Sequence, residues 1–269
     1  MKIAFVGGGN MAAALIAGLL RAGRPAADLF VVEIDGERCA QLQRQFGIAA
    51  ATAPDARLQE AGALVLAVKP QSMREACAAA RPHIGRPLVV SVAAGIRSVD
   101  IARWLGTGAI VRTMPNTPAL IGRGVTGMAA TAQVEGAGRE LAESVLRAVG
   151  DVVWFDDEDQ LDAVTAVSGS GPAYVFYFIE ALARAGTELG LTEGQARQLA
   201  VQTFAGAAQL AADSSEPLQT LRQRVTSKGG TTAAALSWLE SNAVEARIVE
   251  AVHAAHRRAR EMGEEFGRQ

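Results

Sequence analysis

Cysteines, basic tracts and long apolar runs are scarce or missing in this sequence of 269 residues. Its two cysteines, Cys39 and Cys77, form no CxxC pair and do not group with histidine, so we expect no metal site and a reducing, cytoplasmic location. No apolar run is long enough to cross a bilayer, and residues 1–6 begin a strand pattern with no targeting segment before them. We therefore expect a soluble protein without a membrane partner.

The charge of the chain is nearly balanced, with 26 basic and 28 acidic residues and a formal net charge of -2. The basic residues are spread along the chain, so the sequence offers no electrostatic footprint for nucleic acid. An anionic small molecule would need a local site. Because 49% of the residues are hydrophobic, the chain can form a large core, and its length favours two domains.

The first part of the chain alternates between strand and helix patterns. Short β-type runs lie at residues 3–6, 30–34, 63–68, 88–92 and 110–112, with helical stretches between them. Parallel crossovers are usually made by helices, so this alternation predicts an α/β domain with a parallel sheet covered on both faces. Residues 125–130 and 152–155 are expected to complete the sheet, which gives a first domain over residues 1–157.

The second part, residues 158–269, has a helical composition rich in Ala, Leu, Gln and Arg. Thr192 and Gln195 have the spacing of a capping box, Pro172 suits a first helical turn, and Gly190 suits a helix end. Apolar residues recur at helical spacing at Ala196, Leu199, Ala200, Phe204, Ala207 and Leu210. The many small residues would let these helices pack closely against one another or against a second subunit.

A glycine-rich loop joins the first predicted strand to an apolar helix over residues 13–20. Its pattern is Gly-x-Gly-x-x-Ala in the strand, turn and helix context that characterises dinucleotide-binding loops. The first glycine permits the tight turn, the second lets the backbone approach a pyrophosphate, and the helix N-terminus attracts phosphate. The alternative is a glycine turn that binds nothing. The loop residues are Gly7, Gly8, Gly9, Asn10, Met11 and Ala12.

Glu33 and Asp35 follow the second predicted strand, where dinucleotide folds meet the adenosine ribose. A carboxylate there accepts hydrogen bonds from a ribose 2′-hydroxyl and repels a 2′-phosphate, so Glu33 favours NADH over NADPH. Arg38 on the next helix could contact a 2′-phosphate and works against that preference. The alternative is that both acids are solvated loop residues.

Loops after later strands are also candidates for cofactor contacts, because ligands of open α/β sheets bind outside the carboxyl ends of the strands. We expect these loops to surround the nicotinamide half of the cofactor. Lys69 could instead reach solvent, and Asn116 could simply form a turn. The candidate residues are Ala67, Val68, Lys69, Pro70, Ala93, Ala94, Gly95 and Asn116.

Two motifs of small residues interrupt the helical part, VSGSGPAY from Val167 and VTSKGGTT from Val225, and each leads into a helix. Consecutive N–H groups at Gly230, Thr231 and Thr232 would form a nest for a carboxylate, and the Thr232 hydroxyl could bond a substrate nitrogen. A pair of ordinary helix caps would explain the same composition.

Taken together, five motifs resemble those of the pyrroline-5-carboxylate reductase family, in the family's order and over nearly the whole chain. They are the loop from Gly7 to Ala12, the AVKP loop from Ala67, RTMPNTPAL from Arg112, VSGSGPAY from Val167 and VTSKGGTT from Val225. The resemblance implies a Rossmann-like N-terminal domain, followed by an all-α C-terminal domain that binds substrate and forms a homodimer or a ring of dimers. It also implies reduction of 1-pyrroline-5-carboxylate to L-proline with NADPH or NADH.

The resemblance also implies a substrate site, with the carboxylate on the backbone N–H groups of the VTSKGGTT loop and Thr232 as the catalytic residue at the ring nitrogen. The substrate-binding residues are then Pro172, Ser227, Gly229, Gly230, Thr231 and Thr232. None of the five motifs supplies a histidine or carboxylate as a dedicated acid, so we expect catalysis mainly by positioning, with the imine protonated from solvent or through Thr232.

One residue departs from the family pattern, and two other functions remain as alternatives. Lys228 stands where the family usually has proline, which removes a fixed φ from the loop. A β-hydroxyacid dehydrogenase, or another imine reductase, would share the two-domain plan, but the dehydrogenase would want a catalytic lysine on a helix, and Lys228 is in a loop. A non-catalytic nucleotide sensor would bind cofactor without turnover, and the intact Gly-Gly-Thr-Thr loop argues against it.

Overall fold

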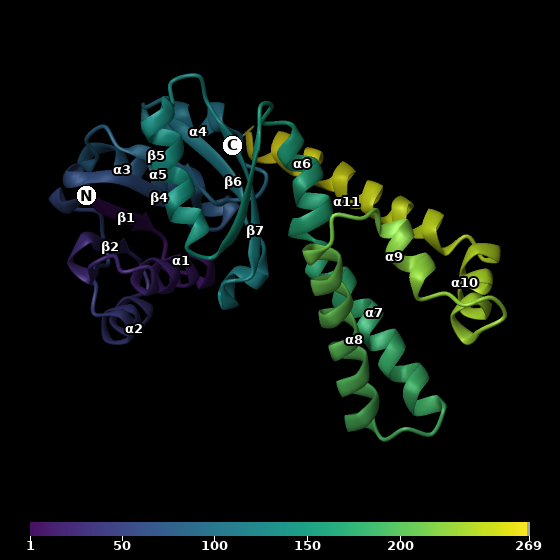
Figure 1. The fold of residues 1–269 in the computed structure, drawn as a ribbon. Helices are drawn as coiled ribbons and strands as arrows, with labels where there is room; N and C mark the ends of the chain where they lie inside the picture. The colour runs from purple at the N-terminus through teal and green to yellow at the C-terminus, as the bar shows by residue number, and fades with distance from the viewer. Residues whose placement is uncertain (268–269) are drawn as a thin grey trace. The chain divides into compact units, whose positions relative to one another are not determined.

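The computed structural model describes residues 1–267, which form two compact units (Figure 1). The first unit contains residues 1–170 together with the chain from Ala255 onward, and the second contains residues 171–254. The predicted division after residue 157 separates the parts by function and stays a prediction, whereas packing divides the chain after Ser170.

The first unit is built on one eight-stranded sheet with the order β3-β2-β1-β4-β5-β6-β7-β8. Neighbouring strands are parallel except β6 and β7, which are antiparallel. The predicted α/β class is confirmed, while β3, a short edge strand of three alanines, was not predicted because alanine carries no strand signal. The strands are β1 (Lys2–Val6), β2 (Leu29–Val32), β3 (Ala49–Ala51), β4 (Ala61–Leu66), β5 (Leu88–Ser91), β6 (Ile110–Met114), β7 (Gly124–Ala130) and β8 (Gly150–Phe155).

Helices cover both faces of this sheet. Alternate side chains of a strand point to opposite faces, so Ile3 and Phe5 join one core and Ala4 and Val6 the other. The first core is closed by α1 (Asn10–Arg21), α2 (Gly36–Phe46) and α5 (Gly136–Arg147). The second is closed by α3 (Met73–Ala80), α4 (Ser98–Leu105) and Phe266 of α11 (Val244–Gly267). Burial on both faces explains why the strands read as continuous apolar runs.

Shorter helical segments connect these elements and complete the first unit. The single-turn pieces are η1 (Ala26–Asp28), η2 (Ala56–Glu60), η3 (Pro70–Ser72), η4 (Arg81–His83) and η5 (Thr117–Ile121). After β8, α6 (Gln160–Val164) continues directly into a π-helical turn, η6 (Thr165–Gly169). Gly127 of β7 lets α6 lie close to the sheet, since a Cβ there would stand 2.8 Å from a Val164 methyl.

The second unit is entirely helical within its described residues. It contains α7 (Gly171–Glu188), α8 (Glu193–Asp213), α9 (Leu218–Arg224), α10 (Thr231–Ser241) and the first part of α11. Figure 1 shows α7 and α8 side by side, and Phe178 stacks on Phe204 with ring centroids 6.5 Å apart. The predicted capping box of Thr192 and Gln195 is confirmed, and Gly190 adopts φ +96° just after α7.

Candidate cofactor site and substrate loop

The glycine loop after β1 has the geometry that the sequence predicts. Gly7 adopts φ +97°, and its N–H donates to the Val32 carbonyl at 2.8 Å, which binds the turn to the neighbouring strand. A Cβ on Gly7 would stand 2.7 Å from the backbone carbonyl of Ala67. Only glycine meets both demands, because other residues adopt positive φ at a cost and none can overlap a backbone atom.

The N-terminus of α1 is open toward solvent. Gly9 is the exposed N-cap residue, no side chain caps this helix end, and a Cβ on Gly9 would meet no atom within 4 Å. Asn10, Met11 and the buried Ala12 form the first turn. The free N–H groups and the positive end of the helix dipole make this turn suited to a phosphate.

Glu33 lies beside the glycine loop, a contact that the sequence did not predict, and is hydrogen-bonded to it. One carboxylate oxygen accepts from the Gly8 N–H at 2.7 Å and the other from the Asp35 N–H at 3.0 Å. Arg38 donates to the Gly8 carbonyl at 2.7 Å and to Gln41 at 2.7 Å. Glu33 and Arg38 are therefore both hydrogen-bonded to the backbone of Gly8. Asp35 accepts from the Glu37 and Arg38 N–H groups and caps α2, so it is not a merely solvated acid.

The loops after β4 and β5 leave the same edge of the sheet as the glycine loop, because β1, β4 and β5 are parallel neighbours. The Ala67 N–H donates to the Val6 carbonyl at 2.8 Å, and Val68 packs at the Gly7 turn. Lys69 is exposed and Pro70 opens η3. These residues lie where a bound cofactor can meet them.

The loop after β5 has a different environment. Ala93 and Gly95 are buried and Ala94 is half-buried. Gly95 adopts φ +75°, and a Cβ there would lie 3.2 Å from Met262 and 3.3 Å from the Phe266 ring. The Cβ direction of Gly95 thus points toward α11. A ligand could contact this residue only through its backbone.

Asn116 is buried, and its side-chain amide is bonded at both ends to the backbone. Its oxygen accepts from the Val125 N–H at 3.0 Å, and its nitrogen donates to the Ser168 carbonyl at 3.2 Å. The sequence indicated a turn residue or a cofactor ligand and gave no sign of this bridge. A role in cofactor binding stays a prediction, and any such contact would have to use the second amide hydrogen.

The predicted substrate loop of the second unit forms a tight turn before α10. The Gly230 N–H donates to the Ser227 carbonyl at 3.1 Å, and Gly229, at φ +73°, occupies the third position of the turn, as in type II turns. Lys228 at the second position is exposed. No side chain caps α10, so the N–H groups of its first turn, which includes Thr231 and Thr232, are open to an anion.

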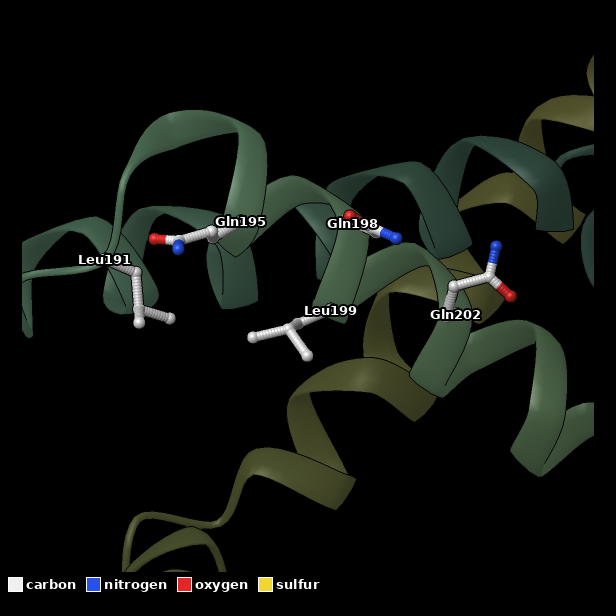
Figure 2. Close-up of a pocket in the computed structure, with 5 residues that line it drawn as sticks. All are labelled: Leu191, Gln195, Gln198, Leu199 and Gln202. Carbon is white, nitrogen blue, oxygen red and sulfur yellow. The ribbon is translucent and has the colours of Figure 1, made fainter.

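Pro172 lies in the first turn of α7, half-buried, as predicted. A shallow pocket in the same unit contains no predicted site residue (Figure 2). It carries no ionisable group and is lined by two leucines and three glutamines of α8 and the turn before it: Leu191, Gln195, Gln198, Leu199 and Gln202. It therefore offers packing surface and no acid, base or nucleophile.

The described residues offer no reactive thiolate, metal-binding cluster or membrane-spanning helix. Burial raises the pKa of the Cys77 thiol to about 12, so this side chain is not a thiolate at neutral pH. Within residues 1–267, no three His, Cys, Asp or Glu side chains gather to hold a metal ion. None of the described helices combines the length and the hydrophobicity that crossing a membrane requires.

The fold and the glycine loop define a class: an oxidoreductase with a Rossmann-like domain for a nicotinamide dinucleotide. The model for "NADP oxidoreductase coenzyme F420-dependent" matches residues 2–95, and that for "Pyrroline-5-carboxylate reductase dimerisation" matches residues 158–262. The chain is 45% identical to the pyrroline-5-carboxylate reductase of Pseudomonas aeruginosa, with 99% of this chain and 98% of the relative covered. It belongs to the pyrroline-5-carboxylate reductase family.

Solved structures agree with this assignment. A pyrroline-5-carboxylate reductase from Coxiella burnetii superposes with a TM-score of 0.91 at 39% identity, covering 97% of this chain and 98% of that one. A pyrroline carboxylate reductase from Plasmodium falciparum with NADP bound gives 0.85 at 28% identity, covering 98% of each chain. The predictions of family, fold class and enzyme class are confirmed.

Proposed function

We propose that the chain reduces 1-pyrroline-5-carboxylate to L-proline by hydride transfer from a nicotinamide dinucleotide. The observation that carries this proposal is the pair of open helix ends, α1 behind the glycine loop and α10 behind the Ser227–Gly230 turn, in a chain of this family. The first suits a pyrophosphate and the second a carboxylate. The cofactor supplies the hydride, and the protein supplies binding, orientation and charge.

The cofactor-binding residues of the proposal lie at the carboxyl edge of the sheet. The pyrophosphate binds to the first-turn N–H groups of α1, and Gly9 leaves the open space that its approach requires. The loops after β4, β5 and β6 surround the nicotinamide. The full set is Gly7, Gly8, Gly9, Asn10, Met11, Ala12, Glu33, Ala67, Val68, Lys69, Pro70, Ala93, Ala94, Gly95 and Asn116.

The preference between NADH and NADPH depends on Glu33. Its carboxylate is fixed by two N–H groups and remains able to accept from a ribose 2′-hydroxyl, since each oxygen has a second lone pair. A 2′-phosphate would meet this fixed negative charge. Arg38 is committed to Gly8 and Gln41, which reduces the compensation that it can offer. The proposal therefore favours NADH.

On the substrate side, the carboxylate binds to the N–H groups of Gly230, Thr231 and Thr232, and the Thr232 hydroxyl bonds the ring nitrogen. Ser227 and Gly229 shape the turn, and Pro172 contributes apolar contact. Protonation of the nitrogen makes the imine carbon a better hydride acceptor, and that proton comes from solvent or through Thr232. The reaction then depends on alignment more than on a dedicated acid.

The proposal includes self-association through the second unit, as a homodimer or a ring of dimers. Large apolar side chains of its helices are exposed, among them Phe176, Tyr177, Leu199, Leu210 and Trp238. Exposed apolar side chains in this number favour an interface on these helices. The proposal also places the enzyme in the cytoplasm, with no nucleic-acid partner, where two free, buried cysteines remain reduced.

The decisive assay follows the absorbance of NADH, and separately of NADPH, when the purified protein meets 1-pyrroline-5-carboxylate. Oxidation of the cofactor with formation of proline is expected, faster with NADH, and Glu33→Gln should reduce the ratio of the two rates. Cofactor binding without oxidation would favour a sensor, and turnover of a hydroxyacid would favour the dehydrogenase alternative.

Thr232→Ala tests the proposed contact to the ring nitrogen, with Thr232→Ser as the control that keeps the hydroxyl. Loss of one hydrogen bond of about 1 to 1.5 kcal/mol predicts a roughly tenfold fall in kcat/KM. The serine variant should stay near the parent enzyme. A loss of several orders of magnitude would mean that Thr232 is an obligatory acid, against the proposal.

A further inference from the structure

Alternate residues at the end of β6 and just after it, Arg112, Met114 and Asn116, contact one segment of the first unit, residues 158–170. Arg112 lies within ion-pair distance of Glu158 and Asp162. A Cβ on Gly169 would stand 2.5 Å from the Met114 methyl, and Asn116 donates to the Ser168 carbonyl at 3.2 Å. The RTMPN and VSGSG motifs, which look like separate loops in the sequence, are thus bound to each other. We call Arg112, Met114 and Asn116 the docking edge.

The charges at the start of this contact are buried. The Arg112 side chain is 3% exposed and the Asp162 side chain 2%. Asp162 pairs with Arg97 at 2.6 Å through one oxygen, while its other oxygen has no hydrogen bond and lies 3.6 Å from Arg112. This buried oxygen accepts no hydrogen bond from the described residues, and Arg112 offsets its negative charge at ion-pair distance.

Glu158 extends the network to α4. Its carboxylate accepts from the Ser98 N–H at 2.7 Å, contacts the Ser98 hydroxyl, and accepts from Arg112 at 3.1 Å. A negative charge at this helix N-terminus is favourable. The network of Arg97, Arg112, Glu158 and Asp162 consequently joins α4, β6 and the first turn of the segment.

The segment held in this way ends in the π-helical turn η6. The Ser170 N–H donates to the Thr165 carbonyl at 2.8 Å, and the Thr165 and Ser168 hydroxyls bond carbonyls one turn earlier. Single π turns are uncommon and occur often at functional sites. The network anchors one end of η6 through α6, and Met114 and Asn116 anchor the other.

We propose that Arg112 and Asp162 are positioning residues of the reaction: with Arg97 and Glu158 they hold residues 165–170 in the geometry that hydride transfer requires. This inference rests on the proposed function, in which the same motif continues to Pro172 at the substrate. Neither side chain touches the glycine loop in the described contacts, so their loss should affect turnover much more than cofactor affinity. Misplacement by about 1 Å can cost a reaction of this kind roughly 100-fold in rate.

The test compares Arg112→Met, Asp162→Leu and the double variant. Each single variant should lower kcat by roughly 10- to 100-fold, change the cofactor Kd by much less, and lower the Tm. The double variant removes both buried charges together. It should recover part of the Tm, since Arg97 and Glu158 are partly exposed and keep Asp159 and Ser98 as partners. Its kcat should stay low, because the directional contacts are gone. Recovery of kcat together with the Tm would overturn the proposal and make the network structural only.

Arg103→Met is the matched control. Arg103 also pairs with a largely buried acid of α4, Asp100, at 2.8 Å, and it donates to the Gly267 carbonyl. Its described contacts include no residue of the 158–170 segment. It should change the Tm without lowering kcat. An equal fall in kcat in this control would count against a specific role of the network.

Hydrogen exchange separates this proposal from the proposed function. In Asp162→Asn, which keeps the size of the side chain, amides of residues 165–170 should exchange faster than in the parent protein, whatever substrate the enzyme uses. Unchanged exchange would overturn the positioning role even if the parent enzyme makes proline. Absence of turnover in the parent protein would refute the proposed function while the exchange result still stands.

Discussion

The two units bury their apolar residues to very different extents. In the first, side chains on both faces of the sheet are covered, and Ile3, Phe5, Leu64 and Val90 are 0% exposed. In the helices that lie wholly within the second, the only described residues classed as buried are two alanines, Ala196 and Ala200. The first unit therefore contains a complete core, whereas the second presents apolar helices that another surface must cover.

The reason lies in the periodicity of the sequence. The side chains on both faces of a strand are buried within one unit when helices cover both faces of the sheet. Helices α7 and α8 instead carry large apolar residues on more than one face, and their contact with each other covers only one of them. Phe176 is 60% exposed, Tyr177 70% and Leu199 58%. We therefore expect the second unit to gain part of its stability from association.

The largest effect is expected from charges on this apolar surface. Phe176→Glu with Leu199→Glu should weaken self-association by roughly a thousandfold or more, because each buried large side chain is worth about 1.5 to 3 kcal/mol and every contact is repeated in the partner. Sedimentation should then show one chain of 28.0 kDa. Val99→Glu, at an exposed position of α4, is the control and should leave the mass unchanged. An unchanged mass in the double variant would show that these side chains do not lie in the subunit interface.

Two glycine variants separate the folding of the glycine loop in the first unit from its binding of cofactor. Gly7→Ala should destabilise the protein without cofactor by more than about 1 to 2 kcal/mol, because the residue has φ +97° and its Cβ would overlap Ala67. Gly9→Ala should leave the Tm unchanged, since its Cβ meets nothing, and should raise the cofactor Kd by roughly tenfold, about 1.4 kcal/mol. Thermal unfolding and cofactor titration measure the two. Equal destabilisation by both would refute the distinction.

A smaller effect is expected at the turn of the second unit. Lys228 occupies the second position of a turn whose third residue, Gly229, has φ +73°. Proline is common at the second position of such a turn. Lys228→Pro should stabilise by about 0.4 to 1 kcal/mol through the unfolded chain. Lys228→Ala is the control for loss of the charge and should not stabilise. Denaturant unfolding would measure both, and a lower stability of the proline variant would show that the turn differs from type II.

The smallest effect concerns acid stability of the first unit. A hydrogen bond from Arg57 lowers the pKa of Asp55 below its ordinary value of 3.8. Its contribution to stability is thus present above pH 3.8 and is lost as the pH falls through the lowered pKa. Asp55→Asn should flatten the fall in stability in this acid range and leave the rest of the pH profile unchanged. An unaltered acid slope would mean that the pair adds nothing.

Much of the first unit and several helix ends of the second could be predicted from the sequence, because strand runs, glycine turns and helix caps are local signals. The glycine loop, the capping box of Thr192 and the position of Pro172 needed no long-range information. Boundaries were less accurate: the strand predicted over residues 30–34 ends at Val32, and that predicted over 63–68 runs from Ala61 to Leu66.

Contacts between distant segments could not be predicted. Arg112 reads as a polar residue at a strand end, and nothing local shows that Asp162, on another element, is its partner. Asn116 was expected in a turn or at the cofactor, and the backbone groups that it bridges lie 9 and 52 positions away. Such pairings arise from tertiary packing, which single-sequence patterns do not contain.

The return of α11 to the first unit has a consequence for synthesis on the ribosome. Phe266 belongs to the core closed by α3 and α4 and packs at Gly95, yet it is translated after the whole second unit. At about 5 to 20 residues per second, the intervening 171–254 stretch takes roughly 4 to 17 s. During that interval the apolar side chains of this core that Phe266 covers stay exposed. We expect chaperones to bind this exposed part of the core until Phe266 has been translated.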